Sequence, residues 1–222
     1  MLYYPRLYIP DIKEGDEWRF YNCSYYSYFK KLITEIKSGK CPFCDVDRHI
    51  NQVFHETHSW MVWENVVAPR PESKSQLIFV PKCHAESISD LPSGILESFW
   101  EFYFDTFKTE YCRSCGITDN GSLLVRTGDA AMNAKSVPHI HFNFHIPNGK
   151  GKLELTVGKS KDNINAKLPL LKVWIKMWGI DESMQGDNMT PVNWETQWMD
   201  FLSQEEWKLT RDCLAPGSKK SA

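Results

Sequence analysis

The sequence lacks several features that would each indicate a particular class of protein. No run reaches the roughly 18 consecutive apolar residues of a membrane-spanning helix. The charges nearly balance, with a formal net charge of −2, so no excess of basic residues indicates a nucleic-acid binder. There is no internal repeat and no low-complexity tract. With 42% hydrophobic and 24% charged residues among 222, the composition is that of an ordinary globular protein.

The N-terminal stretch, MLYYPRLYIPDIKEGDEW, also lacks the short apolar core of a signal peptide and carries charges early. We therefore expect a cytoplasmic protein without a membrane anchor. The chain has seven cysteines, and in a reducing compartment these are expected to be free thiols or metal ligands before they are disulfides.

The hydrophobic pattern predicts a mixture of helices and strands. A helix is expected over 23–40, ending near Gly39. A second helix is expected from an aromatic stripe with helical spacing, made of Ile95, Phe99, Phe102, Tyr103 and Phe107. Further segments are predicted as strands at 59–65, 75–82, 121–128 and 152–157, and as helices at 166–178 and 204–214.

The stretch PHIHFNFHIP, residues 138–147, is the most informative part of the sequence. Alternate residues of a strand share a face, so the pattern places an apolar face behind a polar one. We expect a half-buried strand, because Pro147 and Gly149 then end it. The apolar face would be Ile140, Phe142, Phe144 and Ile146, and the polar face His139, His141, Asn143 and His145.

The motif CPFC, residues 41–44, has the CxxC spacing that lets two thiolates bind one metal ion. An acidic, polar loop follows it, which favours metal binding over redox chemistry. Two completions of a four-ligand site fit the spacing. One uses the second CxxC, Cys112 and Cys115, and the other uses His84 with a histidine of the 138–147 strand.

The loop GDAAMNAKSVPH, residues 128–139, leads into the histidine strand. Its small residues permit close backbone approach, while Lys135 and Ser136 supply a charge and a hydroxyl. These groups suit a phosphate held next to a histidine nucleophile.

The order of these motifs resembles the histidine triad superfamily, whose hallmark is His-x-His-x-His with hydrophobic x residues. SVPHIH and FVPKCH carry the resemblance most strongly, and CPFC adds to it. The resemblance implies an α+β fold, an antiparallel sheet with one long helix, usually assembled as a homodimer. This domain would occupy residues 41–148. An N-terminal extension (1–40) and a C-terminal extension (149–222), both with helices, would flank it.

The resemblance also implies a role for each candidate residue. His141 matches the nucleophile, and Glu64 matches the acidic residue that holds the ribose. Lys135 and Ser136 would contact phosphate, and His145, one step beyond Asn143 on the same face of the strand, could also reach it and partly substitute for the third histidine. Asn143 departs from the family, because it replaces the third histidine, and an amide cannot act as an imidazole acid. The metal would be a structural Zn²⁺ bound by Cys41, Cys44, His84 and His139.

The resemblance implies a nucleotidyl hydrolase or transferase that attacks the α-phosphate of a nucleotide conjugate through a covalent nucleotidyl-histidine intermediate. A neutral imidazole suits this role near pH 7, and a backbone carbonyl or hydroxyl on its second nitrogen would set its tautomer. The alternative is a zinc-stabilised nucleotide-binding or interaction module that has lost catalysis because Asn143 replaces the third histidine.

Overall fold

The computed structural model describes residues 19, 32, 34–36, 38–65, 72–129, 133 and 135–155. The chain divides into two compact units, one made of 1–37 with 160–222 and the other of 38–159. The second unit contains the whole 41–148 segment, and the domain boundaries at 40 and 148 stay predictions. The predicted helices at 166–178 and 204–214 lie outside the described residues.

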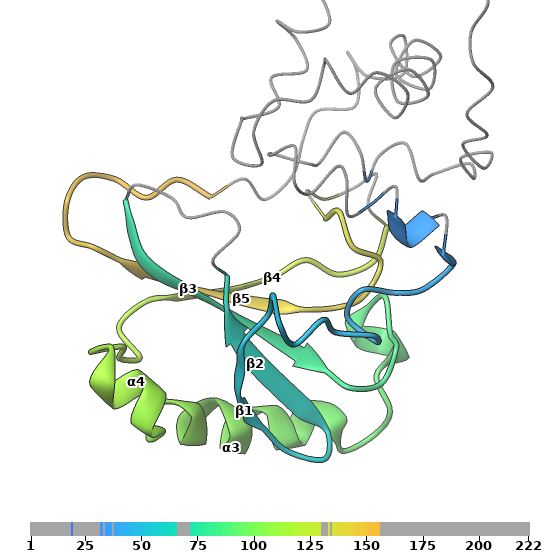
Figure 1. Ribbon diagram of the computed structural model, residues 1–222, viewed down its shortest axis with the longest axis horizontal. Coiled ribbons are helices and arrows are strands. Elements are labelled where there is room, and N and C mark those ends of the chain that lie inside the picture. The colour runs from blue at the N-terminus through green and yellow to red at the C-terminus, as the bar shows by residue number, and fades with distance from the viewer. Residues whose placement is uncertain are drawn as a thin grey trace, which may run out of the picture. The chain divides into compact units, whose positions relative to one another are not determined.

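A single antiparallel sheet organises the second unit (Figure 1). Its strands lie in the order β1-β2-β3-β5-β4, so that β5 sits between β3 and the edge strand β4. The strand bounds are Val53–Glu56 (β1), Trp60–Glu64 (β2), Ser73–Pro81 (β3), Ser122–Val125 (β4) and Phe142–Pro147 (β5). The described residues also form a 3-10 turn, Ile88–Asp90, and two helices, Ile95–Thr106 (α3) and Glu110–Ser114 (α4).

Helix α3 covers one face of the sheet (Figure 1). The aromatic stripe that predicted this helix is confirmed, because Phe99, Phe102 and Tyr103 are buried while Ile95 and Phe107 pack against the same core. The indole nitrogen of Trp60 on β2 donates to the carbonyl oxygen of Ile95 at 2.9 Å. This bond satisfies the one polar atom of a fully buried tryptophan and fixes the start of the helix against the sheet.

The expected helix ends earlier than the aromatic sequence suggests. Thr109 begins the separate helix α4 by accepting a hydrogen bond from the backbone N–H of Cys112.

The helix predicted over 23–40 is described in part. Helical structure is present at residues 32, 34–36 and 38, and Gly39 follows with a positive φ of 66°. Among the described residues, none belongs to a helix long and apolar enough to cross a bilayer.

Strand β5 confirms the predicted division of faces, but the expectation of a half-buried strand was wrong, because Asn143 and His145 on the polar face are buried as well. Ile140, Phe142, Phe144 and Ile146 all lie in the core beneath α3. The opposite face of the sheet is lined by Met61 and Trp63 of β2 and by Ile78 and Val80 of β3, with Phe43 and Val46 of the N-terminal loop packed on them. This second face, on the side of the sheet away from α3, carries the polar positions of β5.

Three strand predictions needed correction. Strand β4 ends at Val125 rather than at residue 128, and β5 begins at Phe142, which leaves His139 and His141 just before its first ladder pair. Residues 152–155 form no strand, although one was predicted over 152–157. Strand β1 was not predicted, because VFHE is too short to show alternation.

Candidate functional site

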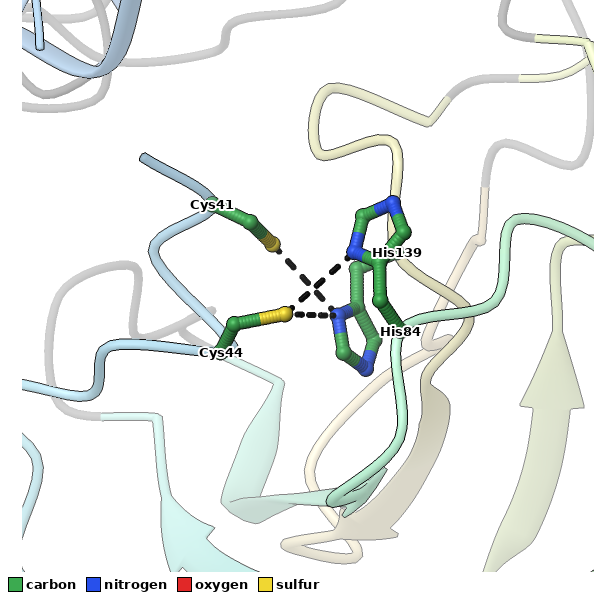
Figure 2. Close-up of side chains that lie close together, drawn as sticks. All are labelled: Cys41, Cys44, His84 and His139. Atoms are coloured by element: carbon green, nitrogen blue, oxygen red, sulfur yellow. Dashed lines mark hydrogen bonds between the residues drawn. The ribbon is translucent and has the colours of Figure 1, made fainter. Parts of the chain in front are cut away.

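Four side chains converge between the N-terminal loop, the end of β3 and the approach to β5. They are Cys41 and Cys44 of the loop, His84 and His139 (Figure 2). The Sγ of Cys44 lies 3.3 Å from Nδ1 of His84 and 3.5 Å from Nδ1 of His139, and the Sγ of Cys41 lies 3.4 Å from the latter. All four donor atoms lie within 4.8 Å of one another.

These distances fit a tetrahedral zinc ion. With Zn–S near 2.3 Å and Zn–N near 2.0–2.1 Å, a sulfur and a nitrogen on one tetrahedron are about 3.6 Å apart. Nε2 of His139 lies 3.0 Å from the carbonyl oxygen of Pro81, which requires a proton on Nε2 and leaves Nδ1 as the lone-pair donor. The predicted ligand set of two thiols and two imidazoles is therefore brought together, in a geometry that can hold Zn²⁺.

The protonation of the cluster agrees with a cation site. Burial, the neighbouring Cys41 and Cys83 raise the pKa of the Cys44 thiol to about 12, so without a cation this sulfur keeps its proton. Burial lowers the pKa of His139 to about 4, which leaves its imidazole neutral and able to donate a lone pair. Two thiols beside two imidazoles are a donor set that suits Zn²⁺.

The all-thiolate alternative is not assembled. Cys112 is buried in the core beneath α4, while Cys115 is exposed at the end of the same helix. Within the part of the chain that the structure describes, the only cluster with metal-ligand geometry is that of Cys41, Cys44, His84 and His139.

The loop that carries the two thiols also reaches the polar face of the sheet. Backbone N–H groups of Cys44 and Asp45 both donate to the carbonyl oxygen of Cys41, which forms a tight turn around the thiols. Phe43, inside this turn, lies edge-on to the rings of Trp63 and His141, with centroid separations of 5.4 and 5.1 Å. Phe43 therefore packs between the metal cluster and His141, a contact that its place inside CPFC did not reveal.

His141 is a neutral imidazole whose tautomer is fixed by the backbone. Its Nδ1 lies 2.8 Å from the carbonyl oxygen of His139, so the proton is on Nδ1 and the lone pair on Nε2. This confirms the expectation that a backbone carbonyl sets the tautomer. Burial is the main cause that lowers the pKa of His141 to about 4, and the nearby charges of Arg126 and Lys135 lower it further. The imidazole is therefore neutral near pH 7, with its one ring proton on Nδ1.

Asn143 lies one step further along the same face and is only 3% exposed. Its Oδ1 accepts a hydrogen bond of 2.9 Å from Nε2 of Gln76 on β3. This contact leaves Nδ2 as a buried donor with no partner among the described residues. His145, the next residue on this face, is 2% exposed and pairs with Gln76 and with Ser122 across the sheet.

The remaining residues predicted to contact a nucleotide are Glu64, Lys135 and Ser136. Glu64 lies on the helix side of β2, where its carboxylate accepts a hydrogen bond of 2.5 Å from the hydroxyl of Tyr111. The structure therefore does not bring Glu64 to the face of His141. Lys135 is buried, and its Nζ donates to the carbonyl oxygen of Glu86 at 3.0 Å. Ser136 is half-buried in the loop just before His139.

No family model matches the chain, and no curated protein matches it significantly. Solved structures with a similar arrangement include a HIT family hydrolase from Legionella pneumophila Philadelphia 1, 18% identical over 51% of this chain and 96% of that one, with a TM-score of 0.38. A zinc-bound histidine triad family protein from Mycobacterium smegmatis is 19% identical over 64% and 97%, with a TM-score of 0.40. A HIT family hydrolase from Clostridium thermocellum is 18% identical over 52% and 97%, with a TM-score of 0.40.

These structural neighbours are histidine triad proteins, and one of them binds zinc. Their identities and TM-scores are too low to transfer an activity.

Proposed function

We propose that this protein is a nucleotidyl hydrolase or transferase of the histidine triad type, with His141 as its nucleophile. The observation that carries the proposal is the hydrogen bond from Nδ1 of His141 to the carbonyl oxygen of His139, which leaves Nε2 of a neutral imidazole as the atom with the lone pair. The buried, unpartnered Nδ2 of Asn143 supports it, because this donor suits an oxygen of the attacked phosphate.

The reaction proceeds by two displacements at the α-phosphorus. The Nε2 lone pair forms a P–N bond while the bond from phosphorus to the leaving group breaks, and the electron pair leaves with that group. Water then attacks phosphorus, the P–N bond breaks, its electron pair returns to Nε2, and the proton of water passes to solvent. In a transferase, a second acceptor replaces water. Dividing the reaction in this way replaces one difficult displacement by two easier ones.

The residues assigned to the metal have a separate role. Cys41, Cys44, His84 and His139 would hold a Zn²⁺ ion whose coordination is closed by protein ligands, as in structural sites. Bound there, the ion would tie the N-terminal loop to His84 after β3 and to His139 before β5, and it would fix the carbonyl oxygen of His139 that orients His141.

The direct test is turnover. The full-length protein is incubated with a nucleoside phosphoramidate and with a dinucleoside polyphosphate, and mass spectrometry follows nucleotide release and an acid-labile nucleotidyl adduct. We expect both signals, and we expect His141→Ala to lower the rate by at least about 10³-fold. His58→Ala, a change at an exposed histidine, is the matched control.

Asn143 favours one alternative, a nucleotide-binding module with little or no catalysis. An amide can donate to a phosphate oxygen but cannot protonate a leaving group. Nucleotide binding without release or adduct, unchanged in His141→Ala, would establish this alternative and exclude the enzyme.

A homodimer is also part of the proposal. Helix α3 exposes Leu96, Trp100 and Phe104 at successive four-residue intervals on its outer side, with Trp100 and Phe104 each 53% exposed. Such a stripe supports a second copy packing there.

A cytoplasmic location is supported by the five described cysteines, which are all free thiols. They are Cys41, Cys44, Cys83, Cys112 and Cys115.

A further inference from the structure

Lys135 joins two segments that meet beside the nucleophile, although the resemblance implies for it only a contact with phosphate. Its side chain is 2% exposed, and its Nζ donates to the carbonyl oxygen of Glu86 at 3.0 Å. A lysine is seldom buried so completely unless its ammonium is hydrogen-bonded, because burying an unpaired charge is costly. The ammonium is therefore part of the framework of the protein before any ligand arrives.

Glu86 belongs to a segment after β3 that also holds the chain entering β5. His84, two residues earlier, lies in the metal cluster together with His139. The carbonyl oxygen of Ala85 accepts a hydrogen bond of 2.6 Å from the backbone N–H of Ile140. Because Ile140 lies between His139 and the nucleophile, the position of this segment determines where the backbone of the nucleophile lies.

The hydrogen bonds around Lys135 form a closed circuit. The backbone N–H of Ile88 donates to Oγ1 of Thr127 at 2.9 Å. The carbonyl oxygen of Thr127 accepts from Nδ2 of Asn133 at 2.9 Å, and Oδ1 of Asn133 accepts from the backbone N–H of Lys135 at 3.0 Å. The ammonium of Lys135 returns to Glu86, two residues before Ile88. A bond broken at one point of such a circuit weakens the others, because its members orient one another.

The charge of Lys135 acts on the same segment. Hydrogen bonds from Ser87 lower the pKa of Asp90, and the charge of Lys135 lowers it further. The attraction between this ammonium and the Asp90 carboxylate adds to the hydrogen bond on Glu86, so both draw Lys135 toward the residues that follow β3.

We propose that Lys135 is a positioning residue for the nucleophile, because its bond to Glu86 fixes the segment that holds the backbone of Ile140 and so the place of His141. The proposal rests on the proposed function, and it gives Lys135 this role in place of the phosphate contact that the resemblance implies. The ammonium does not touch the substrate. Its loss therefore slows the attack on phosphorus, by displacing the imidazole, without weakening the binding of the nucleotide.

Lys135→Met keeps an unbranched side chain of similar length and removes the ammonium. We expect kcat to fall by about 10- to 150-fold, as for loss of a hydrogen bond from a charged group, while the Kd of a nucleoside monophosphate changes by less than about twofold. Lys108→Met, the same change at an exposed lysine after α3 that pairs with Asp105, should alter neither value. A weaker Kd for the monophosphate, with an unchanged Kd for its nucleoside, would show a phosphate contact and overturn the proposal.

A second variant breaks the circuit at an exposed residue and leaves the charge of Lys135 in place. Thr127→Val removes the hydroxyl that accepts from Ile88 and should lower kcat by about 2- to 12-fold. In the double variant of Lys135→Met with Thr127→Val, the two losses should not multiply, because both changes act through the same segment. Losses that multiply would show that Lys135 acts independently of this segment, against the proposal.

Amide hydrogen exchange of the ligand-free protein separates this proposal from the proposed function. The N–H of Ile140 should exchange at least about 10-fold faster in Lys135→Met than in the wild type, because its bond to Ala85 opens more often, while the amides of β2 keep their rates.

If the wild type shows neither turnover nor a nucleotidyl adduct, the enzyme assignment fails, and faster exchange at Ile140 still supports the positioning role of Lys135. Unchanged exchange at Ile140 overturns that role whether or not the protein is an enzyme. Faster exchange throughout β2 as well would show that Lys135 stabilises the whole fold rather than this segment, and it would also overturn the proposal.

Discussion

The side-chain amide of Gln76 donates from Nε2 to Oδ1 of Asn143 at 2.9 Å, and this contact decides which end of the Asn143 amide faces the site. Because Oδ1 is occupied, the buried Nδ2 is the group left for a ligand. A donor at that place attracts a phosphate oxygen, whereas an exposed carbonyl oxygen would repel it.

Gln76→Glu tests this relationship with almost no change in volume. A carboxylate at residue 76 accepts but does not donate, so it would bind Nδ2 of Asn143 and turn Oδ1 toward the phosphate. We expect kcat/KM to fall by about 5- to 100-fold, equivalent to about 1–3 kcal/mol. Steady-state kinetics measures the effect, with Gln52→Glu at an exposed position as the control. Equal kinetics for Gln76→Glu and the wild type would contradict the assigned orientation.

Asn143→His restores an imidazole where the family pattern has one. We expect the variant to gain activity on a nucleoside phosphoramidate, by up to about 100-fold, because an imidazole can protonate the departing amine. The gain on a dinucleoside polyphosphate should be smaller, since that leaving group needs no proton. Parallel kinetics on the two substrates measures the difference, and Asn120→His, at an exposed position, is the control. A loss on both substrates in a folded variant would show that the amide has a role an imidazole cannot replace.

Metal analysis tests the four-ligand cluster. The purified protein should contain about one zinc per chain, and Cys41→Ser and His84→Ala should each lose it, because a closed tetrahedral site needs all four ligands. Cys115→Ser, which changes an exposed thiol outside the cluster, should keep the metal. Zinc retained in Cys41→Ser and lost in Cys115→Ser would reverse the assignment. Chelation should lower the thermal transition of the wild type.

The loop that carries the thiols is attached to the sheet by an ion-pair cluster with its own pH dependence. Glu56 on β1 accepts hydrogen bonds of 3.0 and 2.9 Å from Arg48 of the loop and pairs with Lys82 beyond β3 at 2.9 Å. Hydrogen bonds from Arg48 and Lys82 lower the pKa of Glu56 from 4.5 to about 2. A carboxylate with a depressed folded pKa stabilises the fold above its unfolded pKa.

This stabilisation is therefore complete above about pH 4.5 and is lost as the pH falls toward 2. In Glu56→Gln we expect a shallower fall in stability over this window than in the wild type. Chemical denaturation at a series of pH values measures it. Arg48→Gln and Lys82→Gln should each reproduce part of the change, because each removes one partner. Parallel pH profiles for Glu56→Gln and the wild type would show that the cluster does not stabilise the fold.

The sequence predicted correctly which residues share a face where the two-residue alternation of a strand determines it. Alternation on one strand was enough to divide Ile140, Phe142 and Phe144 from Asn143 and His145, because a one-residue error would have turned every polar side chain into the core beneath α3. The same rule explains the misplacement of Glu64. Trp63 and Glu64 are neighbours on β2, and since Trp63 faces the site, Glu64 must face the helix.

Other parts of the site depend on pairings between segments far apart in the chain. Choosing between His84 and the pair Cys112 and Cys115 required knowing that α4 lies on the far side of the sheet. Gln76 enters through the register of β5 with β3, which no motif encodes. Local spacing identified the chemistry of individual residues, and only strand order showed which of them meet.

Because the chain is made from its N-terminus, the four residues of the metal cluster are not synthesised at the same time. Cys41 and His139 are separated by 98 positions, and His84 lies between them. At a synthesis rate of about 5–20 residues per second, the two cysteines leave the ribosome about 5–20 s before the last of their histidines. During that interval they form an incomplete pair of ligands, open to oxidants and to competing metals. His139 is made two residues before His141, so the last proposed zinc ligand and the proposed nucleophile leave the ribosome almost at the same time.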